Sequence, residues 1–343
     1  MAGRTRIGIF ITNQQYVERD MVSALDEQIA MVRLARDLGW DSVFTGQHYL
    51  NEGNNQQLQS VPFLARLAAE AGEMTVGLGV LLLNLHNPVY VAETVASLDV
   101  ICRGNFVFGV GLGYREIEFD AFAVPKGQRL KRFEECLALV QRLWTEDEVT
   151  YESEVCKLTK VRMNLRPVQK PRPPIWYAAN NDNAVTRAAH QGDTWFVNPH
   201  ATQATLARQM KLYRAELKRV GKPFPDVLPC AKEIFCAKDR KTAIEMAGPY
   251  LAGKYASYAS WGQDKVMPKG ESFQVPFEKL LEDRFVLGSP EECYAQLLPT
   301  VKTMGVNHLL LRTHWAGLPL AAALSSMRLM SHELLPELRK IGS

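Results

Sequence analysis

The chain has 343 residues, of which 47% are hydrophobic and 22% are charged, and its formal net charge is +3. This balance is that of an ordinary globular protein with a sizeable core, and the small, dispersed charge argues against nucleic acid as a partner. The six cysteines form no C-x-x-C pair, so neither a zinc site nor any other metal site is predicted. Polar residues 12–20 follow a short apolar run, and no apolar stretch approaches membrane-spanning length. We therefore expect no signal peptide, no membrane contact and a cytoplasmic location.

Apolar runs with the length of strands alternate along the chain with segments of helical periodicity. The predicted strands cover 6–11, 41–44, 75–83, 105–110, 174–178, 194–197, 228–237 and 307–312. These runs are continuously apolar, which is typical of parallel strands that are buried on both faces. No repeat of fixed period and no linker divides the chain. The count of eight favours one α/β domain over 1–343, a (β/α)₈ TIM barrel, over a doubly wound sheet.

Helical spacing of apolar residues marks the segments between the strands. In the first, the apolar residues from Val22 to Ala35 share one face, Ser23 and Asp26 resemble a capping box, and Gly39 ends the helix. The later predicted helices cover 61–71, 89–101, 130–144, a stretch from about 183, 206–220, 239–255, 290–304 and 318–338.

Two segments interrupt this alternation. Residues 150–166 are predicted to form a hairpin insertion. Residues 256–282 are rich in Gly, Ser, Gln and Lys and are predicted to form a long loop or lid. The second segment carries Tyr258, Trp261, Phe273 and Phe277, which would cover a substrate at the barrel mouth. The alternative is an excursion that packs on the side of the barrel or contacts another subunit.

Several blocks of the sequence carry a family resemblance. LGWDSVFTGQHY, VGLGVLLLNLHNPVYVAETVASLDVICRGNFVFGVGLGY and LWTEDEVTYE…RPVQKPRPPIWYAANN resemble successive blocks of the bacterial luciferase-like flavin-dependent monooxygenases. The tail FVLGSPEECYAQLLPTVKTMGVNHLLLR is also similar to that family. The resemblance implies a luciferase-like barrel that binds a flavin, with its chemistry at the C-terminal ends of the strands.

His48, after the second predicted strand, occupies the position of the family's active-site histidine. The resemblance implies that it lies near the reactive face of the flavin and handles a proton there, work that suits an imidazole because it titrates near neutrality. The alternative is a histidine that only satisfies a loop carbonyl. The family's Glu-His-His run is Gln47-His48-Tyr49 here, so its carboxylate is missing.

The third predicted strand carries Gly79-Val80, for which the resemblance implies a non-prolyl cis peptide or a bulge behind the flavin ring. The alternative is a glycine that allows close packing within the barrel. Asn84, after the same strand, is a further candidate for cofactor binding. The glycines around Gly111 do not match G-x-G-x-x-G, and we expect no helix directly after them. They would let the backbone pass beneath a flat cofactor.

Residues after the fourth and fifth strands are candidates for flavin contacts. In the family such residues contact the flavin, so Tyr114 and Arg115 are predicted to do so, with Arg115 paired to the phosphate. The alternative for Arg115 is a surface arginine paired with Glu116 or Glu118. The turn Ala179-Asn180-Asn181 leads into a helix, whose free amides suit a phosphate. Asp182 would repel a phosphate there unless it caps the helix.

His314 and Trp315 follow the last predicted strand, where they form either a substrate wall or core packing. The resemblance implies a two-component monooxygenase, because no second nucleotide-binding domain is apparent in the chain. A separate flavin reductase would then supply reduced FMN, and O₂ and a small organic substrate would complete the reaction in a homodimer. The alternatives are a deazaflavin-dependent dehydrogenase of the same superfamily and a non-catalytic flavin-binding protein.

Overall fold

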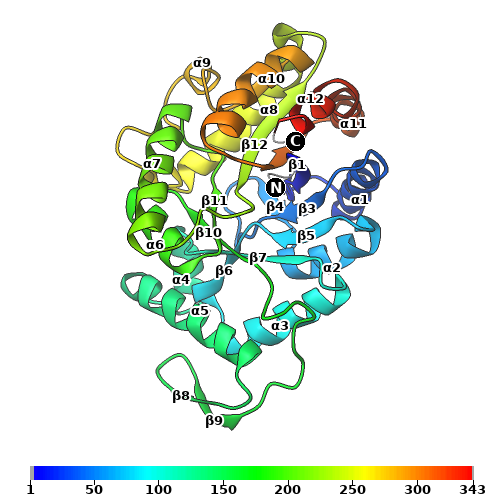
Figure 1. The fold of residues 1–343 in the computed structure, drawn as a ribbon. Coiled ribbons are helices and arrows are strands. Elements are labelled where there is room, and N and C mark those ends of the chain that lie inside the picture. Colours follow the sequence, from blue (N-terminus) through cyan, green and yellow to red (C-terminus); the bar gives the residue numbers. More distant parts are fainter. Residues whose placement is uncertain (1–3, 342–343) are drawn as a thin grey trace.

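The computed structural model describes residues 4–341, and its eight long parallel strands close into a barrel surrounded by helices (Figure 1). Neighbouring strands pair in chain order, and the last pairs with the first, so the barrel has no open edge. The predicted TIM barrel is therefore confirmed. Its strands are β1 (Arg6–Ile11), β3 (Ser42–Thr45), β5 (Thr75–Leu78), β7 (Phe106–Gly111), β10 (Ile175–Ala179), β11 (Thr194–Val197), β12 (Pro229–Cys236) and β14 (His308–Arg312).

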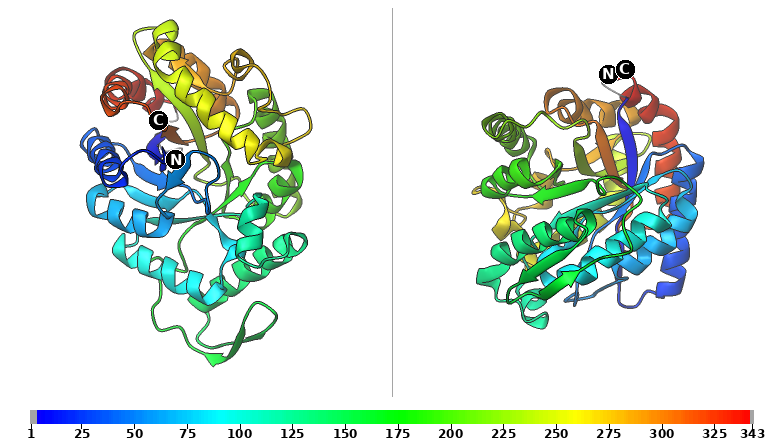
Figure 2. Two further views of the ribbon diagram at one scale, coloured as in Figure 1. Left: turned by 180° about the vertical axis from the view of Figure 1, so that it is seen from behind. Right: turned by 60° about the horizontal axis from the view of Figure 1, so that its bottom comes forward.

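Six short strands lie outside this ring of eight. β6 (Leu81–Leu82) pairs with β7, and β13 (Val286–Gly288) pairs with β12. β2 (Gln14–Tyr16) and β4 (Asn55–Gln57) form an antiparallel pair. β8 (Val149–Glu152) and β9 (Lys157–Val161) form an antiparallel hairpin that projects from the body of the barrel (Figures 1 and 2).

Helices cover the outside of the ring, and α8 lies alongside β12 (Figure 2). The 3₁₀ turns η1 (Leu83–Leu85), η2 (Lys126–Gln128) and η3 (Asp264–Val266) and the π-helical turns η4 (Pro299–Thr303) and η5 (Met330–Leu334) connect or extend these helices. Within residues 4–341, no helix is both long and apolar enough to cross a membrane. The helices are α1 (Met21–Asp37), α2 (Ser60–Ala71), α3 (Pro88–Ile101), α4 (Glu116–Ala121), α5 (Arg129–Thr145), α6 (Asp182–Gln191), α7 (Gln203–Arg219), α8 (Arg240–Ser260), α9 (Phe277–Leu280), α10 (Pro290–Leu298), α11 (Leu320–Leu329) and α12 (Leu335–Arg339).

The start of α1 corrects one expectation. Its N-cap is Asp20, whose side chain accepts a hydrogen bond from the backbone N–H of Ser23 at 2.8 Å. The predicted capping box of Ser23 and Asp26 is wrong, because a cap needs extended backbone and Asp20 is the last extended residue before the helix. Val22, assigned to the apolar face, is 69% exposed.

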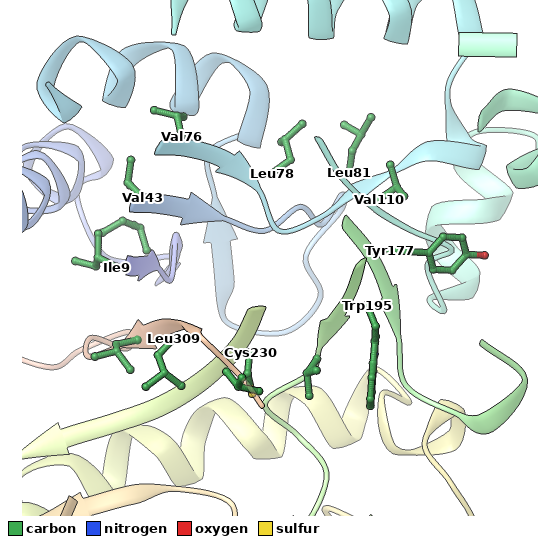
Figure 3. Close-up of a cluster of buried hydrophobic side chains, with 14 of the residues drawn as sticks. Ile9, Val43, Val76, Leu78, Leu81, Val110, Tyr177, Trp195, Cys230 and Leu309 are labelled. Carbon is green, nitrogen blue, oxygen red and sulfur yellow. The ribbon is translucent and has the colours of Figure 1, made fainter. Parts of the chain in front are cut away.

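The core has two layers because side chains alternate across each strand. On the inner side, aromatic rings fill the barrel, and Phe44 stacks on Trp176 with centroids 4.9 Å apart. On the outer side, apolar side chains point from the strands toward the helices, as Figure 3 shows for Ile9, Val43 and Val76. The filled interior leaves the ends of the strands as the place for a ligand.

Candidate active site

The main cavity lies at the C-terminal ends of the barrel strands and has a volume of about 280 Å³. Seven strands of the ring contribute to its wall through their own last residues or the loop that follows, and β12 contributes Ala231 from its first half. Of the residues proposed from the sequence, those that line the cavity are His48, Gly79, Val80, Gly111, Tyr114, Asn180 and Asn181.

Two glycines keep one wall of the cavity thin. The peptide bond between Gly79 and Val80 is cis, as the family resemblance implies, and it divides the predicted strand 75–83 into β5 and β6. A Cβ atom on Gly79 would come within 2.7 Å of the Phe10 ring, and one on Gly111 within 2.5 Å of the Val80 side chain. Larger residues at either position would displace side chains that form the wall. The two glycines therefore let Phe10 and Val80 pack directly against the backbone, and they line the cavity without side chains of their own.

His48 faces the cavity and is held from behind by a carboxylate. Its Nδ1 lies 3.3 Å from Oε1 of Glu118, and the same oxygen accepts the backbone N–H of Tyr49 at 2.8 Å. Glu118 is buried and lies on α4, a short helix that we did not expect after Gly113. The carboxylate that is missing from Gln47-His48-Tyr49 is thus supplied from 70 residues further along the chain.

Arg115 has a different role from the predicted one. It is only 1% exposed, and its guanidinium donates to the carbonyls of Tyr49 at 2.6 Å and Leu50 at 2.9 Å. It also lies 3.4 Å from Glu118 and stacks over the ring of Trp261, with Cζ 4.6 Å from the centroid. The predicted pairing with Glu118 is present, but Arg115 is buried rather than at the surface, and it is absent from the lining of the cavity, which argues against the phosphate role. The buried guanidinium is committed to these partners and braces the loop that carries His48.

The turn before α6 forms one end of the cavity. Asn181 caps α6 by accepting the backbone N–H of Ala184 at 3.1 Å, and the free amides of this helix start face a negative ligand favourably. Asp182 points instead to Arg208, with paired contacts of 2.6 and 2.9 Å that lower the pKa of its carboxyl. This pairing removes the repulsion expected from Asp182. Ala179 is buried in β10, and its carbonyl accepts the indole N–H of Trp195, so the turn begins at Asn180.

Two arginines that were missed from the sequence complete this end. Arg129 at the start of α5 and Arg187 on α6 both line the cavity. An arginine beside a helix N-terminus supplies charge and paired donors suited to a phosphate. The only sequence signal for Arg187 was its place one turn and a half into α6, on the helix that follows the Asn180-Asn181 turn.

Three other predicted site residues lie outside the lining of the cavity. Asn84 is fully buried in η1, behind β6. The ring of His314 contacts the carbonyl of Leu318 at 2.9 Å, and the indole of Trp315 donates to Glu233 at 2.7 Å. Because the chain leaves the ring after Arg312, these two side chains pack in the core, and the substrate-wall alternative is wrong for both.

The segment 256–282 covers part of the cavity and is more ordered than expected. α8 continues to Ser260, so the first five residues of the predicted loop are helical. Tyr258, Trp261 and Phe273 are buried, and the side-chain amide of Asn181 donates to the carbonyl of Val266 at 3.2 Å. The ring of Trp261 lies 5.4 Å from that of His48 between centroids. Tyr258 and Trp261 therefore pack against the same histidine that faces the cavity, whereas Phe273 packs against His200.

The fold and the site together define a TIM-barrel protein with a ligand cavity at the C-terminal mouth of the barrel. Residues 5–308 match the family model described as luciferase-like monooxygenase, and the chain belongs to this family. It is 24% identical, over 98% of its length and 99% of the relative's, to F420-dependent glucose-6-phosphate dehydrogenase of Amycolatopsis mediterranei (strain U-32). A match to uncharacterized protein y4vJ of Sinorhizobium fredii (strain NBRC 101917 / NGR234), 27% identical, spans 54% of this chain and 52% of that protein.

Solved structures share the fold along nearly the whole chain. Monooxygenase RslO1 from Streptomyces bottropensis superposes with a TM-score of 0.86 at 24% identity and covers 97% of this chain and 99% of its own. The oxygenating constituent of 3,6-diketocamphane monooxygenase of Pseudomonas putida, solved in complex with FMN, gives 0.80 at 16% identity with the same coverage. Apart from the uncharacterized y4vJ, the proteins named here are oxidoreductases: two are monooxygenases and one is an F420-dependent dehydrogenase.

Proposed function

We propose that the protein is the oxygenase of a two-component monooxygenase that takes reduced FMN from a separate reductase and uses O₂ to oxygenate a small organic substrate. The observation that carries the proposal is the arrangement of one cavity. A cationic helix start lies at one end, a thin glycine wall lies beside it, and a carboxylate-backed histidine faces it. In this proposal the helix start binds the phosphate of the cofactor, the glycines lie against its ring, and the histidine transfers a proton.

The residues present fit FMN. The backbone amides at Asn180-Asn181, with Arg129 and Arg187, would hold the phosphate, while Gly79-Val80 and Gly111 would face the ring. When bound, reduced FMN supplies the electrons that activate O₂. The protein's own contribution is to orient the bound molecules, to exclude water and to handle protons.

His48 is the residue proposed to move a proton. Because Nδ1 lies against Glu118, that carboxylate orients the ring and leaves Nε2 as the atom available to the cavity. Glu118 is a positioning residue in this proposal, since it reaches the reacting groups only through His48.

Replacing His48 with alanine is expected to leave the affinity for FMN within about threefold, because phosphate contacts dominate binding, and to lower product formed per O₂ by roughly 10²-fold or more. Glu118→Gln should cause a smaller loss and shift the pH profile of product formation, since a neutral amide no longer supports a charged imidazole. Single-turnover assays across pH measure both. A Glu118→Gln enzyme whose pH profile matches the wild type would exclude the positioning role.

The segment 256–282 is proposed to act as a lid that keeps water from the cavity. Within this segment, the ring of Trp261 lies nearest to the ring of His48, and the guanidinium of Arg115 stacks on the Trp261 ring. Limited proteolysis tests this, because cleavage within 256–282 should slow when FMN and substrate are both bound. Cleavage at the same rate with and without these ligands would show that the segment is structural.

The second candidate is an F420-dependent dehydrogenase, favoured by the full-length likeness to the Amycolatopsis enzyme. The hydrogen bond from Asn181 to Val266 favours FMN, because it draws the 256–282 segment across the phosphate end. FMN ends at its phosphate, whereas F420 continues beyond it as a tail that would have to pass this bond.

Titration of the purified protein with FMN and with F420, followed by O₂ uptake with each reduced cofactor, distinguishes the candidates. The proposal expects tight FMN binding and O₂ uptake that depends on reduced FMN. Preferential binding of F420, with hydride transfer and no O₂ uptake, would replace it with the second candidate. Binding of oxidised FMN without any turnover would instead support the alternative of a non-catalytic flavin-binding protein.

A further inference from the structure

A group of buried charges borders the main cavity through Arg312, away from the proposed phosphate end. The carboxylate of Glu233 on β12 accepts hydrogen bonds from Nζ of Lys254 at 2.7 Å, a guanidinium nitrogen of Arg312 at 3.1 Å and the indole of Trp315 at 2.7 Å. Glu233 is 0% exposed, and both cationic side chains are at most one-tenth exposed. Among the described residues, Glu233 is the one carboxylate within ion-pair distance of either cation. While Lys254 is protonated, one positive charge is therefore left over in a region where an uncompensated charge is costly.

Arg312 presents that charge to the cavity. It is the last residue of β14, it lines the cavity, and its guanidinium lies over the ring of Phe10 with Cζ 3.9 Å from the centroid. A Cβ on Gly79 would come within 2.7 Å of the same ring, so Arg312 and Gly79 both lie beside Phe10. Its Nε is buried, and no hydrogen-bond partner for it is found within residues 4–341. The cation thus has unused donor capacity at the cavity surface.

The neighbouring side chains add no negative charge. His200 lines the cavity next to this group, and burial, followed by the charges of Arg312 and Lys254, lowers its pKa well below the ordinary value. Tyr258 faces the same region, and burial raises the pKa of its hydroxyl to about 12. Both groups are neutral near pH 7, so neither adds a negative charge beside Arg312. Burial lowers the pKa of Lys254 to about 7, so the excess positive charge is full below that pH, where the protein does not offset it.

We propose that Arg312 binds a delocalised oxyanion, a carboxylate or a phenolate, that the substrate carries into the cavity. A guanidinium offers two parallel donors to such a group, and the Phe10 ring fixes its plane. This names the substrate class for the proposed monooxygenase and rests on that function for the reaction, although not for the binding of the anion. The negatively charged ring edge of reduced flavin is a second anion that Arg312 could bind. The test below distinguishes this flavin anion from a substrate anion.

The test uses benzoate and benzamide, which have the same shape and differ in charge, titrated by calorimetry into the protein with and without FMN. The wild-type protein should bind benzoate at least about tenfold more tightly than benzamide. Arg312→Met should abolish this preference, Arg312→Lys should retain part of it, and Arg172→Met, which removes an arginine paired with Asp193 outside the cavity, should leave it unchanged. Arg312→Met leaves Glu233 and Lys254 as a matched pair, and thermal unfolding checks that it folds.

Equal binding of benzoate and benzamide by the wild-type protein, or a preference that survives Arg312→Met, would overturn the proposal. If Arg312→Met lowers the affinity for reduced FMN relative to oxidised FMN and the wild type does not prefer benzoate, the charge serves the flavin and the assignment to substrate is wrong. A protein that prefers benzoate through Arg312 yet does not bind FMN would keep the anion site and refute the proposed function.

Discussion

Replacing Glu233 with glutamine is expected to destabilise the fold by about 3–5 kcal/mol, because it leaves two buried cations without the carboxylate they share. Glu233 is inaccessible to solvent and accepts from Lys254, Arg312 and Trp315, so no water can replace the lost charge without opening the core. Equilibrium unfolding in urea, compared with the wild type, measures the change.

The size of this loss should depend on pH. Burial lowers the pKa of Lys254 to about 7 even with Glu233 present, and removal of the carboxylate lowers it further. The folded Glu233→Gln protein therefore binds fewer protons than its unfolded chain already below pH 7, so its stability rises with pH there, whereas that of the wild type begins to rise only near pH 7. The loss should therefore shrink as the pH rises to about 7 and stay constant from about 7 to about 10, where both proteins gain stability alike. Lys254 can shed its charge as the pH rises, whereas Arg312 cannot.

Two further variants serve as a control and a rescue for this prediction. Glu70→Gln removes a carboxylate that pairs with Arg33 and Arg66 at the surface, where solvent screens the charges, and should change stability little. Adding Lys254→Met to Glu233→Gln removes one of the stranded cations and should recover part of the loss. If Glu233→Gln is no less stable than Glu70→Gln, the buried charges are compensated in some other way.

The barrel could be predicted because burial on both faces leaves a direct record in the sequence. Most strands of the ring are largely apolar runs, such as β1 and β14, and turn residues separate them from the next helix, whereas β12 is interrupted by Lys232 and Glu233. The shorter elements leave no such record. β2 contains Gln14 and Gln15, which are buried by their surroundings rather than by an apolar pattern, and the six residues of α4 are too few to show helical periodicity.

The site was predicted where backbone position alone decides what a residue faces. Gly79, Val80 and Asn181 lie in turns at strand ends, and the position in the chain is enough to place them at the cavity. For long side chains, position in the chain does not determine the direction in which the side chain points. Arg115 is next to Tyr114 in the chain, yet it turns inward to the carbonyls of Tyr49 and Leu50, and no sequence pattern gives that direction.

The functional residues that the sequence did not predict were missed for a different reason. Glu118 and Arg312 act through partners that are far away in the chain, and their roles depend on distances that only the folded structure supplies. Arg312 ends a predicted strand, so its place at the barrel mouth could have been inferred. Its partner Glu233 lies in the interior of the predicted strand 228–237, where a lone buried carboxylate is itself a signal that a cation must be close.

Riboflavin is expected to bind at least about a hundredfold more weakly than FMN, because it lacks the phosphate that the start of α6 is proposed to hold. Hydrogen bonds to a charged group contribute about 1.5–3 kcal/mol each, and two of them already account for a difference of this size. Quenching of flavin fluorescence during titration gives both dissociation constants. The comparison separates the phosphate end from the ring, since the two ligands share every other group.

Variants at the phosphate end assign the effect to particular cations. Arg187→Met should reduce the preference for FMN over riboflavin by about tenfold, because Arg187 lines the cavity on the helix whose amides face the phosphate. Arg172→Met, at the opposite end of β10 and paired with Asp193, should leave the preference intact. Equal affinities for the two flavins would remove the phosphate from this turn. Equal effects of the two arginine variants would mean that net charge attracts FMN from a distance, in which case raising the salt concentration should abolish the preference, whereas direct contacts should largely withstand it.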